Sequence, residues 1–325
     1  MLRTTAFFLT LSTAALAEVP QVMTDIAPIQ SLAARVMAGI GAPDVLLPPG
    51  ASPHDYALRP SDAARLAETD LMIWVGHGLT PWLEGPIASL AADAQHLELL
   101  KTTGWTALPL RSDPAFAEAE AAEHPADAQG AEEQVEEGHA AATGAADTDL
   151  ADAGTDPHAW LDPSNAAVFM TLMAEDLARL DPANAAAYRA NAAAAGHEMT
   201  RLRAEGLGML ADHAGGRYIV PHDAYQYFES GFGMPAAGAI SLTDAAAPGP
   251  ARVAALQQMV ASGAVTCILT DPQTSPAWSG LLAEGTLART ALVDPDGGSQ
   301  SAETLAGLYP AIIRSLVAGL AECLG

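Results

Sequence analysis

The amino-acid sequence predicts an α/β protein of two lobes, each built on a parallel sheet, joined by one long rigid helix. Strand-like and helical stretches alternate in both halves of the chain, which is typical of parallel βαβ units with a covered sheet. Between the halves lies an Ala-rich helical stretch from residue 182 to about 210. About thirty helical residues reach about 45 Å, so this helix can join two lobes as a strut. We expect an N-terminal lobe over 18–181, a linker helix over 182–212 and a C-terminal lobe over 213–325.

The first seventeen residues are expected to precede the fold. Arg3 gives a positive start, an apolar run follows, and Ala15-Leu16-Ala17 fits the cleavage site of a secretory signal peptide. The apolar run is too short to span a bilayer, and we find no other candidate span. The mature chain should therefore begin near Glu18 and be soluble outside the cytoplasm. An uncleaved N-terminal anchor is the competing interpretation.

In the N-terminal half, short apolar runs bounded by Gly, Pro or charged residues predict strands, and longer stretches between them predict helices. The expected strands are 21–23, 44–47 and 71–75, and the expected helices are 28–38 and 61–68. Residues 112–155 break this pattern, because they contain many acids, no Lys or Arg and almost no large apolar side chains. Such a stretch cannot bury enough surface to fold, so we expect a mobile acidic loop.

The second half repeats the alternation after the long helix. Asp181 is a good N-cap for that helix, and Pro182 suits its first position. The expected strands are 217–220, 265–270 and 289–293, and the expected helices are 250–262 and 302–322.

Charge and cysteine content narrow the class of protein. The net charge is −25, with 39 acidic against 14 basic residues, which argues against a nucleic-acid partner and suits a chain that attracts cations. The two cysteines, Cys267 in a predicted strand and Cys323 in the last helix, form an even count that favours a disulfide in an exported protein. Two free buried thiols are the alternative.

Three histidines carry the chemistry of the sequence. His54, His158 and His222 lie in separate loop-like segments, Pro53-His54-Asp55-Tyr56, Asp156-Pro157-His158-Ala159-Trp160 and Pro221-His222-Asp223-Ala224-Tyr225. Three neutral imidazoles that converge on one point make a zinc site with one open position. The alternative is that each histidine is a polar loop residue engaged by its neighbours.

The predicted strands place these residues together. In parallel α/β sheets, ligands bind outside the carboxyl ends of the strands. His54, His222, Asp271 and Asp294 all follow predicted strands, so they belong where the two lobes face each other. We therefore expect the metal site in the cleft between the lobes.

The segment from Gly50 to Asp62 and the two later histidine segments resemble the metal-ligand motifs of zinc-uptake periplasmic binding proteins, the ZnuA-like group of metal-binding receptors. The resemblance covers essentially the whole chain, including Pro272-Gln273 and the two cysteines. It implies two lobes joined by a rigid helix with Zn²⁺ in the cleft. It also implies delivery of the metal to an ABC transporter, with its permease and ATPase, in the inner membrane. We expect a monomer.

The chain departs from the family pattern in two places. The acidic loop holds only His124 and His139, where relatives are often rich in histidine, and Pro53 stands where relatives often have Glu. For the fourth ligand, Asp294 is favoured because it resembles the position of a carboxylate ligand in related proteins. Asp271 and water are the alternatives.

The ligand types favour zinc, since manganese sites prefer more carboxylate, although copper and nickel also bind imidazole tightly. His77 follows a strand and is a weaker candidate for contact with the metal. A secreted zinc hydrolase is the main competing function, but the sequence contains neither a His-Glu-x-x-His motif nor a Gly-x-Ser-x-Gly motif. A metal-binding adhesin or metallochaperone on the same scaffold is a third possibility.

Overall fold

The computed structural model describes residues 19–112, 116, 154–244 and 246–325. Each lobe contains a four-stranded parallel sheet. The N-terminal sheet has the order β2-β1-β3-β4, with β1 at Val22–Thr24, β2 at Asp44–Val45, β3 at Leu71–Trp74 and β4 at Gln95–Glu98. The C-terminal sheet has the order β6-β5-β7-β8, with β5 at Tyr218–His222, β6 at Gly238–Ser241, β7 at Cys267–Thr270 and β8 at Arg289–Leu292. Both sheets thus share one strand order, and the predicted fold class is confirmed.

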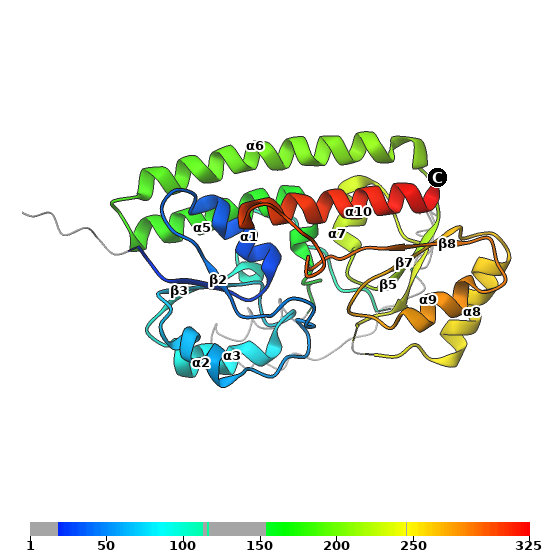
Figure 1. Cartoon of the computed structure of the whole chain (residues 1–325), viewed down its shortest axis with the longest axis horizontal. Helices are drawn as coiled ribbons and strands as arrows, with labels where there is room; N and C mark the ends of the chain where they lie inside the picture. Colours follow the sequence, from blue (N-terminus) through cyan, green and yellow to red (C-terminus); the bar gives the residue numbers. More distant parts are fainter. Residues whose placement is uncertain (1–18, 113–115, 117–153, 245) are drawn as a thin grey trace, which may run out of the picture.

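Four helices run along the side of both sheets and form a common spine (Figure 1). They are α1 (Ala27–Val36), α5 (Pro163–Leu180), α6 (Ala185–Leu210) and α10 (Leu308–Leu324). The 26 residues of α6 reach across both lobes, as the sequence predicts for the linker helix. Its small residues permit close packing, and a Cβ on Gly206 would lie 2.5 Å from a ring carbon of Phe232.

The hydrophobic core is continuous from one lobe to the other. One cluster of buried side chains joins Leu32 and Ile73 of the N-terminal lobe to Tyr218 and Leu269 of the C-terminal lobe through the spine. Two smaller clusters lie on the outer faces of the sheets, under α2 (Pro60–Ala67) and α3 (Glu84–Leu90) in one lobe and under α8 (Pro250–Ala261) and α9 (Pro276–Ala283) in the other. The central cluster therefore fixes how the two lobes sit relative to each other.

Several sequence-based expectations need correction. The long helix begins at Ala185, because Asp181 instead ends α5 and its carboxylate accepts hydrogen bonds from Asn184 and Tyr188. The last helix begins at Leu308 rather than 302. The prediction did not include α3, β4, β6, α9 or α7 (Gln226–Phe232), all of which are short. The expected signal peptide and nearly all of the acidic loop lie outside the described residues.

The sequence predicts no further segment that could span a membrane, and one helix does not fit this prediction. Among the described residues, Leu305–Leu324 is long and apolar enough to do so by length and composition. In the structure α10 instead buries Tyr309, Ile313, Leu316 and Leu320 against the spine and the C-terminal sheet. Its apolar character therefore serves the core.

The predicted disulfide between Cys267 and Cys323 is present and ties β7 to the end of α10. We expect the C267S/C323S double variant to lose about 4 kcal/mol of unfolding free energy, because the bridge closes a loop with a sequence separation of 56. Denaturant titration measures this loss, and adding a reductant to the variant should cause no further loss. Equal stability of variant and oxidised parent would show that the bridge does not constrain the unfolded chain.

Candidate metal centre

The structure brings the three predicted histidines together. His54 lies in the loop between β2 and α2, His158 directly precedes the 3₁₀ turn Ala159–Leu161, and His222 is the last residue of β5. One ring nitrogen from each lies within 4.8 Å of the others. The strand that contains His222 ends two residues later than the sequence predicts, so His222 lies at the carboxyl edge of the sheet.

The geometry of this histidine cluster is that of a buried site between lobes. The ring centroids of His54 and His158 are 5.4 Å apart, and those of His158 and His222 are 5.8 Å apart. His158 and His222 are buried, whereas His54 remains partly exposed. A cation that enters the cluster can therefore reach it from the side of His54.

Two carboxylates orient the buried imidazoles. His158 Nδ1 lies 2.8 Å from Asp156 Oδ1, and His222 Nδ1 lies 2.9 Å from Asp271 Oδ2. In the tautomer that donates from Nδ1, each Nε2 is left as an acceptor for a metal. A carboxylate that holds the second ring nitrogen in this way fixes the ring and raises its basicity as a ligand. The sequence analysis considered Asp271 as a ligand and did not assign Asp156.

The pKa values of His54 and His222 are shifted in opposite directions. Burial, aided by neighbouring His158, lowers the pKa of His54 to about 4, so its ring is neutral at ordinary pH. Burial also lowers the pKa of His222, but the hydrogen bond and charge of Asp271 outweigh it and the net shift is upward. Burial raises the pKa of Asp271, but the hydrogen bond and charge of His222 together with the hydrogen bonds from Thr274 outweigh it, so the net shift of this pKa is downward.

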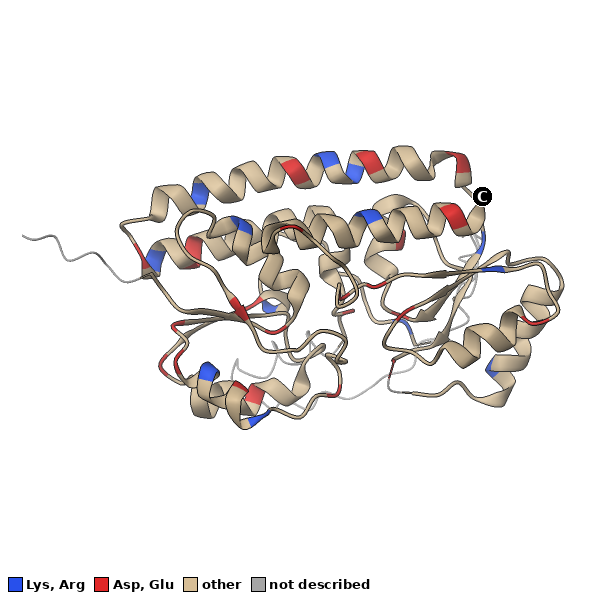
Figure 2. Cartoon of the chain, in the orientation of Figure 1, with Lys and Arg blue, Asp and Glu red and all other residues tan. Residues whose placement is uncertain are grey.

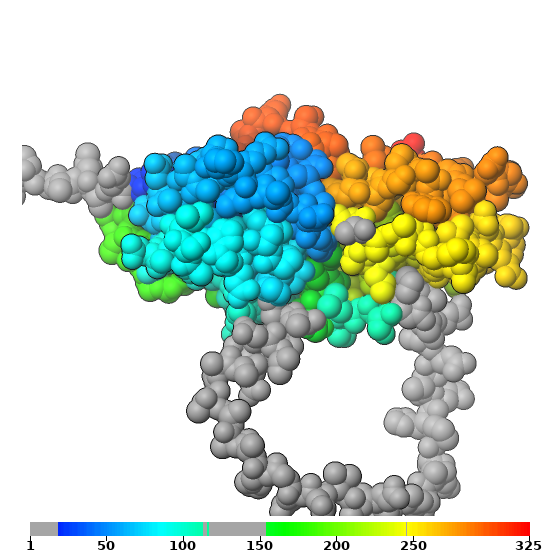
Figure 3. Space-filling view, turned by 90° about the horizontal axis from the view of Figure 1, so that it is seen from below, coloured from blue at the N-terminus to red at the C-terminus, as the bar shows by residue number. Residues whose placement is uncertain are grey.

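Residues from both lobes enclose the cluster. Trp160 is fully buried beside His158, with ring centroids 5.4 Å apart, and donates its Nε1–H to the carbonyl of Pro295 at 3.1 Å. Gly298 lies so close to the other lobe that a Cβ there would be 2.6 Å from the Gly50 nitrogen. Figure 3 shows the blue surface of the N-terminal lobe meeting the yellow and orange surface of the C-terminal lobe. The site therefore lies where the lobes touch.

Asp294, the favoured fourth ligand, has other partners. Its carboxylate accepts backbone N–H groups from Asp296 at 3.1 Å, Gly297 at 2.9 Å and Ser299 at 2.6 Å. The group of described residues close enough to share an ion contains the three histidines without it. Ligation of a metal by Asp294 stays a prediction. It requires the carboxylate to give up some of these hydrogen bonds in order to bind the metal.

A second charged cluster lies beside the histidines. Arg111, at the start of the acidic segment, donates to Asp223 at 3.0 Å and to Glu229 at 2.8 Å. Burial raises the pKa of Asp223 to about 7 even though Arg111 opposes the shift. Since Asp223 follows His222, this cluster joins the start of the acidic segment to the site. Sequence reasoning missed it because its members are far apart along the chain.

The other histidines that the sequence analysis considered are not part of this cluster. His77 is half-exposed, and its Nδ1 lies 3.0 Å from Glu84 Oε2, outside the cluster. His124 and His139 lie outside the described residues. Acidic residues occur where the lobes meet, and basic residues are spread over the helices (Figure 2). In the described part of the chain, the three histidines are the group whose ligand atoms lie close enough together to hold a metal.

Comparison with known families identifies the protein's relatives. A family model described as zinc-uptake complex component A, periplasmic, matches residues 22–323. The chain belongs to this family. It is 40% identical over 332 residues to the high-affinity zinc uptake system protein ZnuA of Paracoccus denitrificans, covering 97% of this chain and 96% of that protein. It is 34% identical over 311 residues to the protein of the same name in Brucella abortus, covering 93% and 91%. The resemblance seen in the sequence is confirmed.

Solved structures share the fold of this family. A crystal structure of ZnuA aligns with a TM-score of 0.73 at 21% identity, covering 95% of this chain and all of that one. The laminin-binding protein Lmb of Streptococcus agalactiae, described as having adhesin and metal-transporting activity, aligns with a TM-score of 0.69 at 18% identity, covering 93% and 99%. These likenesses establish the architecture.

The pairing of His222 with Asp271 makes a measurable prediction for the metal-free protein. Replacing Asp271 with Asn should lower the pKa of His222, because the carboxylate that most strongly opposes the effect of burial is removed. In the parent, the raised pKa of His222 means that its protonation stabilises the folded state. This stabilisation is fully present at pH values below the ordinary histidine pKa and is lost as pH rises through the pKa of His222 in the folded state. Imidazole NMR titration measures the shift, with the exposed Asp212→Asn as control. An unchanged pKa for His222 would contradict this account.

Proposed function

We propose that this chain captures Zn²⁺ with one ring nitrogen each from His54, His158 and His222 and passes it to an ABC transporter in the inner membrane. The observation that carries this proposal is the convergence of three imidazole nitrogens within 4.8 Å in a largely buried place between lobes. For His158 and His222 the ligating atom is Nε2, since Nδ1 faces a carboxylate. Three imidazoles leave one position of a tetrahedral zinc centre for a further ligand.

The donor set supports zinc as the cargo. Imidazole suits zinc, whereas manganese prefers carboxylate and water, and here each nearest carboxylate binds the outer edge of a histidine. The curated relatives are components of high-affinity zinc uptake systems. This chain is accordingly a zinc-binding component of such a system.

Further properties follow from the family and the sequence. The family consists of periplasmic binding components, so we propose export by residues 1–17 as a signal peptide and work in the periplasm as a monomer. A permease and an ATPase are the proposed partners. We also propose residues 18–181 and 213–325 as the two lobes and 182–212 as the segment that joins them, most of which is α6 (Ala185–Leu210). No turnover is proposed, because a binding component needs capture and release alone.

Adhesion is the second candidate function. A structural neighbour is described as bifunctional, with adhesin and metal-transporting activity. At 18% identity, that likeness shows a shared fold and nothing more. Zinc uptake is favoured because relatives at 40% and 34% identity are zinc uptake proteins.

Alanine substitutions of the three histidines test the site. H54A, H158A and H222A should each weaken zinc binding by more than about 100-fold, since loss of a direct ligand exceeds the 10- to 100-fold cost typical of its outer partners. Competition titration with a chromophoric chelator measures the affinity. The exposed His197 on α6 provides the control variant H197A, which should bind like the parent. Parent-like affinity in all three variants would refute the site.

Acid should weaken binding mainly through His222. Imidazoles must be neutral to ligate, so protons compete with zinc as pH falls. The pKa of His54 is lowered to about 4, so this ring stays neutral, whereas the raised pKa of His222 makes His222 hold a competing proton at higher pH than His54 does. We expect affinity to fall below about pH 6. D271N, which removes the cause of the raised pKa, should shift this fall to lower pH, and an unshifted profile would assign the proton elsewhere.

Deletion of the acidic segment tests whether it belongs to the primary site. Leu110 N–H donates to Gly154 O at 2.9 Å, and Asp156 N–H donates to Leu108 O at 2.9 Å, so the segment begins and ends in an antiparallel pair. An Asn-Gly turn in place of residues 113–153 fits such a pair and retains Arg111. We propose that 112–155 is an accessory loop, so one tight zinc equivalent should remain in calorimetry while weaker equivalents disappear. Loss of the tight equivalent in a folded variant would make His124 or His139 a primary ligand.

A further inference from the structure

The two carboxylates that orient the buried histidines are secured in different ways. Asp271 faces the ring of His222 with Oδ2, while its Oδ1 accepts bonds of 2.8 Å from both the N–H and the hydroxyl of Thr274. Asp156 has no such second anchor among the described residues. Its Oδ1 lies 3.0 Å from the backbone nitrogen and 2.8 Å from Nδ1 of His158, and its Oδ2 is buried without a hydrogen-bond partner there. The position of the Asp156 carboxylate therefore depends on its backbone.

The backbone of Asp156 is held on both sides. Its N–H donates to the carbonyl of Leu108 at 2.9 Å, within the antiparallel pair in which Pro109 faces Thr155. Its carbonyl accepts the hydroxyl of Tyr227 at 3.0 Å. The same hydroxyl accepts the N–H of Leu108 at 2.9 Å. One phenol oxygen thus binds both chain segments of this pair.

Tyr227 reaches the pair from the other half of the chain. It belongs to α7, which follows the long helix α6, whereas Leu108 and Asp156 precede that helix. Its side chain is buried, and its ring centroid lies 6.4 Å from that of Trp105. Because packing fixes the ring, the hydroxyl is a fixed point of the C-terminal lobe against which Asp156 is set.

A second contact ties the same pair to α7. Arg111, directly after the pair, donates to Glu229 at 2.8 Å, and Glu229 lies on α7 with Tyr227. This ion pair can hold α7 in place without the hydroxyl. Loss of the Tyr227 hydroxyl alone should therefore displace Asp156 locally and leave the contact between the lobes intact.

We propose that Tyr227 is a positioning residue of the zinc site, which sets the imidazole of His158 through Asp156. The proposal rests on the function given above and adds a residue that does not touch the metal. The bonds run from the Tyr227 hydroxyl to the Asp156 carbonyl, and from the Asp156 carboxylate to the ring of His158. Outer partners fix the orientation of a metal-binding histidine, and their loss weakens binding. Tyr227 extends this control by one residue and carries it from one lobe to the other.

Zinc titration of Y227F, with Y218F as the matched control, tests the proposal. Y227F keeps the ring and removes the hydroxyl, so affinity should fall about 3- to 10-fold, less than the 10- to 100-fold typical of a ligand's direct partner. Tyr218 is also buried, and its hydroxyl donates to the carbonyl of Met234 at 2.6 Å. Y218F loses a comparable bond and should bind zinc like the parent. An equal fall in both variants would overturn the proposal, because a general loss of stability would then explain it.

A double-mutant cycle shows whether Tyr227 acts through Asp156. D156A alone should weaken zinc binding by about 10- to 100-fold. Y227F added to D156A should weaken it by less than about 2-fold further, because no carboxylate remains to be positioned. Losses that add as independent free energies would overturn the proposal.

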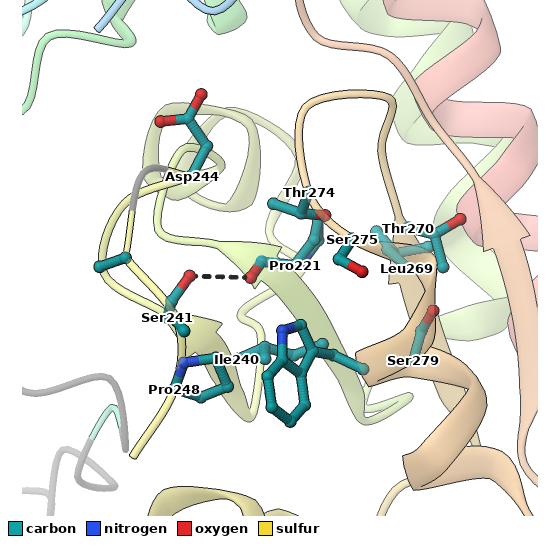
Figure 4. Close-up of a pocket in the computed structure, with 13 residues that line it drawn as sticks. Pro221, Ile240, Ser241, Asp244, Pro248, Leu269, Thr270, Thr274, Ser275 and Ser279 are labelled. Carbon is teal, nitrogen blue, oxygen red and sulfur yellow. Dashed lines mark hydrogen bonds between the residues drawn. The ribbon is translucent and has the colours of Figure 1, made fainter. Parts of the chain in front are cut away.

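Imidazole NMR of the metal-free protein gives a readout that needs no zinc. The ring signals of His158 should shift in Y227F while those of His222 stay in place, and T274V should do the reverse, because Thr274 anchors Asp271. Thr274 is one of the residues that line a cavity of about 190 Å³ in the C-terminal lobe (Figure 4), so T274V removes the hydroxyl without crowding a packed core. Unmoved His158 signals in Y227F would overturn the proposal.

Failure of this inference is distinct from failure of the proposed function. If Y227F matches a zinc-binding parent in affinity, Tyr227 is not a positioning residue. If the parent itself binds no zinc, the proposed function fails. Where D156A does not fold, the ring signals decide the inference, because that comparison needs Y227F and T274V alone.

Discussion

The convergence of three imidazoles on one point is the constraint on which the rest of the structure depends. Burial disfavours protonation of His54, and the neighbouring rings add to that effect, so the pKa of His54 is lowered to about 4. The rings can stay together only if something fixes their orientation. Asp156 and Asp271 do this from outside, each at a position set by its own strand or turn. The arrangement therefore presents neutral nitrogens inward and carboxylates outward.

The repeated sheet order explains how residues so distant in sequence meet. The two sheets have equivalent strand orders, and the carboxyl ends of their strands contribute His222 and the loop that holds His54. The central core runs through both lobes by way of the spine, so separating the lobes would expose buried apolar side chains such as Trp160 and Tyr309. The rigid part of the molecule thus fixes the two buried histidines, His158 and His222.

The sequence predicts the architecture and the three histidines well, because both depend on local signals. Alternating apolar runs mark the strands, and the histidine motifs are compact enough to be recognised individually. What it could not give are pairings set by tertiary contact, such as Asp271 with His222 or Arg111 with Glu229, at 49 and 118 residues apart. The start of the long helix was misplaced for a related reason. Asp181 and Pro182 look like a helix start, but the carboxylate of Asp181 serves the turn between α5 and α6, where it binds Tyr188.

The buried acids around the site bear on how the protein accommodates a dication. Burial raises the pKa of Asp223 to about 7, and burial together with neighbouring Asp294 raises that of Asp296 to about 7. Asp223 directly follows His222, and the charge of Asp296 acts on that ring. Groups with a pKa near neutrality are partly protonated at neutral pH, and a nearby cation lowers their pKa. We therefore expect a dication bound beside them to release protons from these carboxyls, so that the charge of the buried region rises by less than two units, and a proton-release measurement during zinc titration checks this. Asp223 and Asp296 are costly to ionise in the metal-free site, and their carboxylates are the groups that would offset the charge of a bound dication.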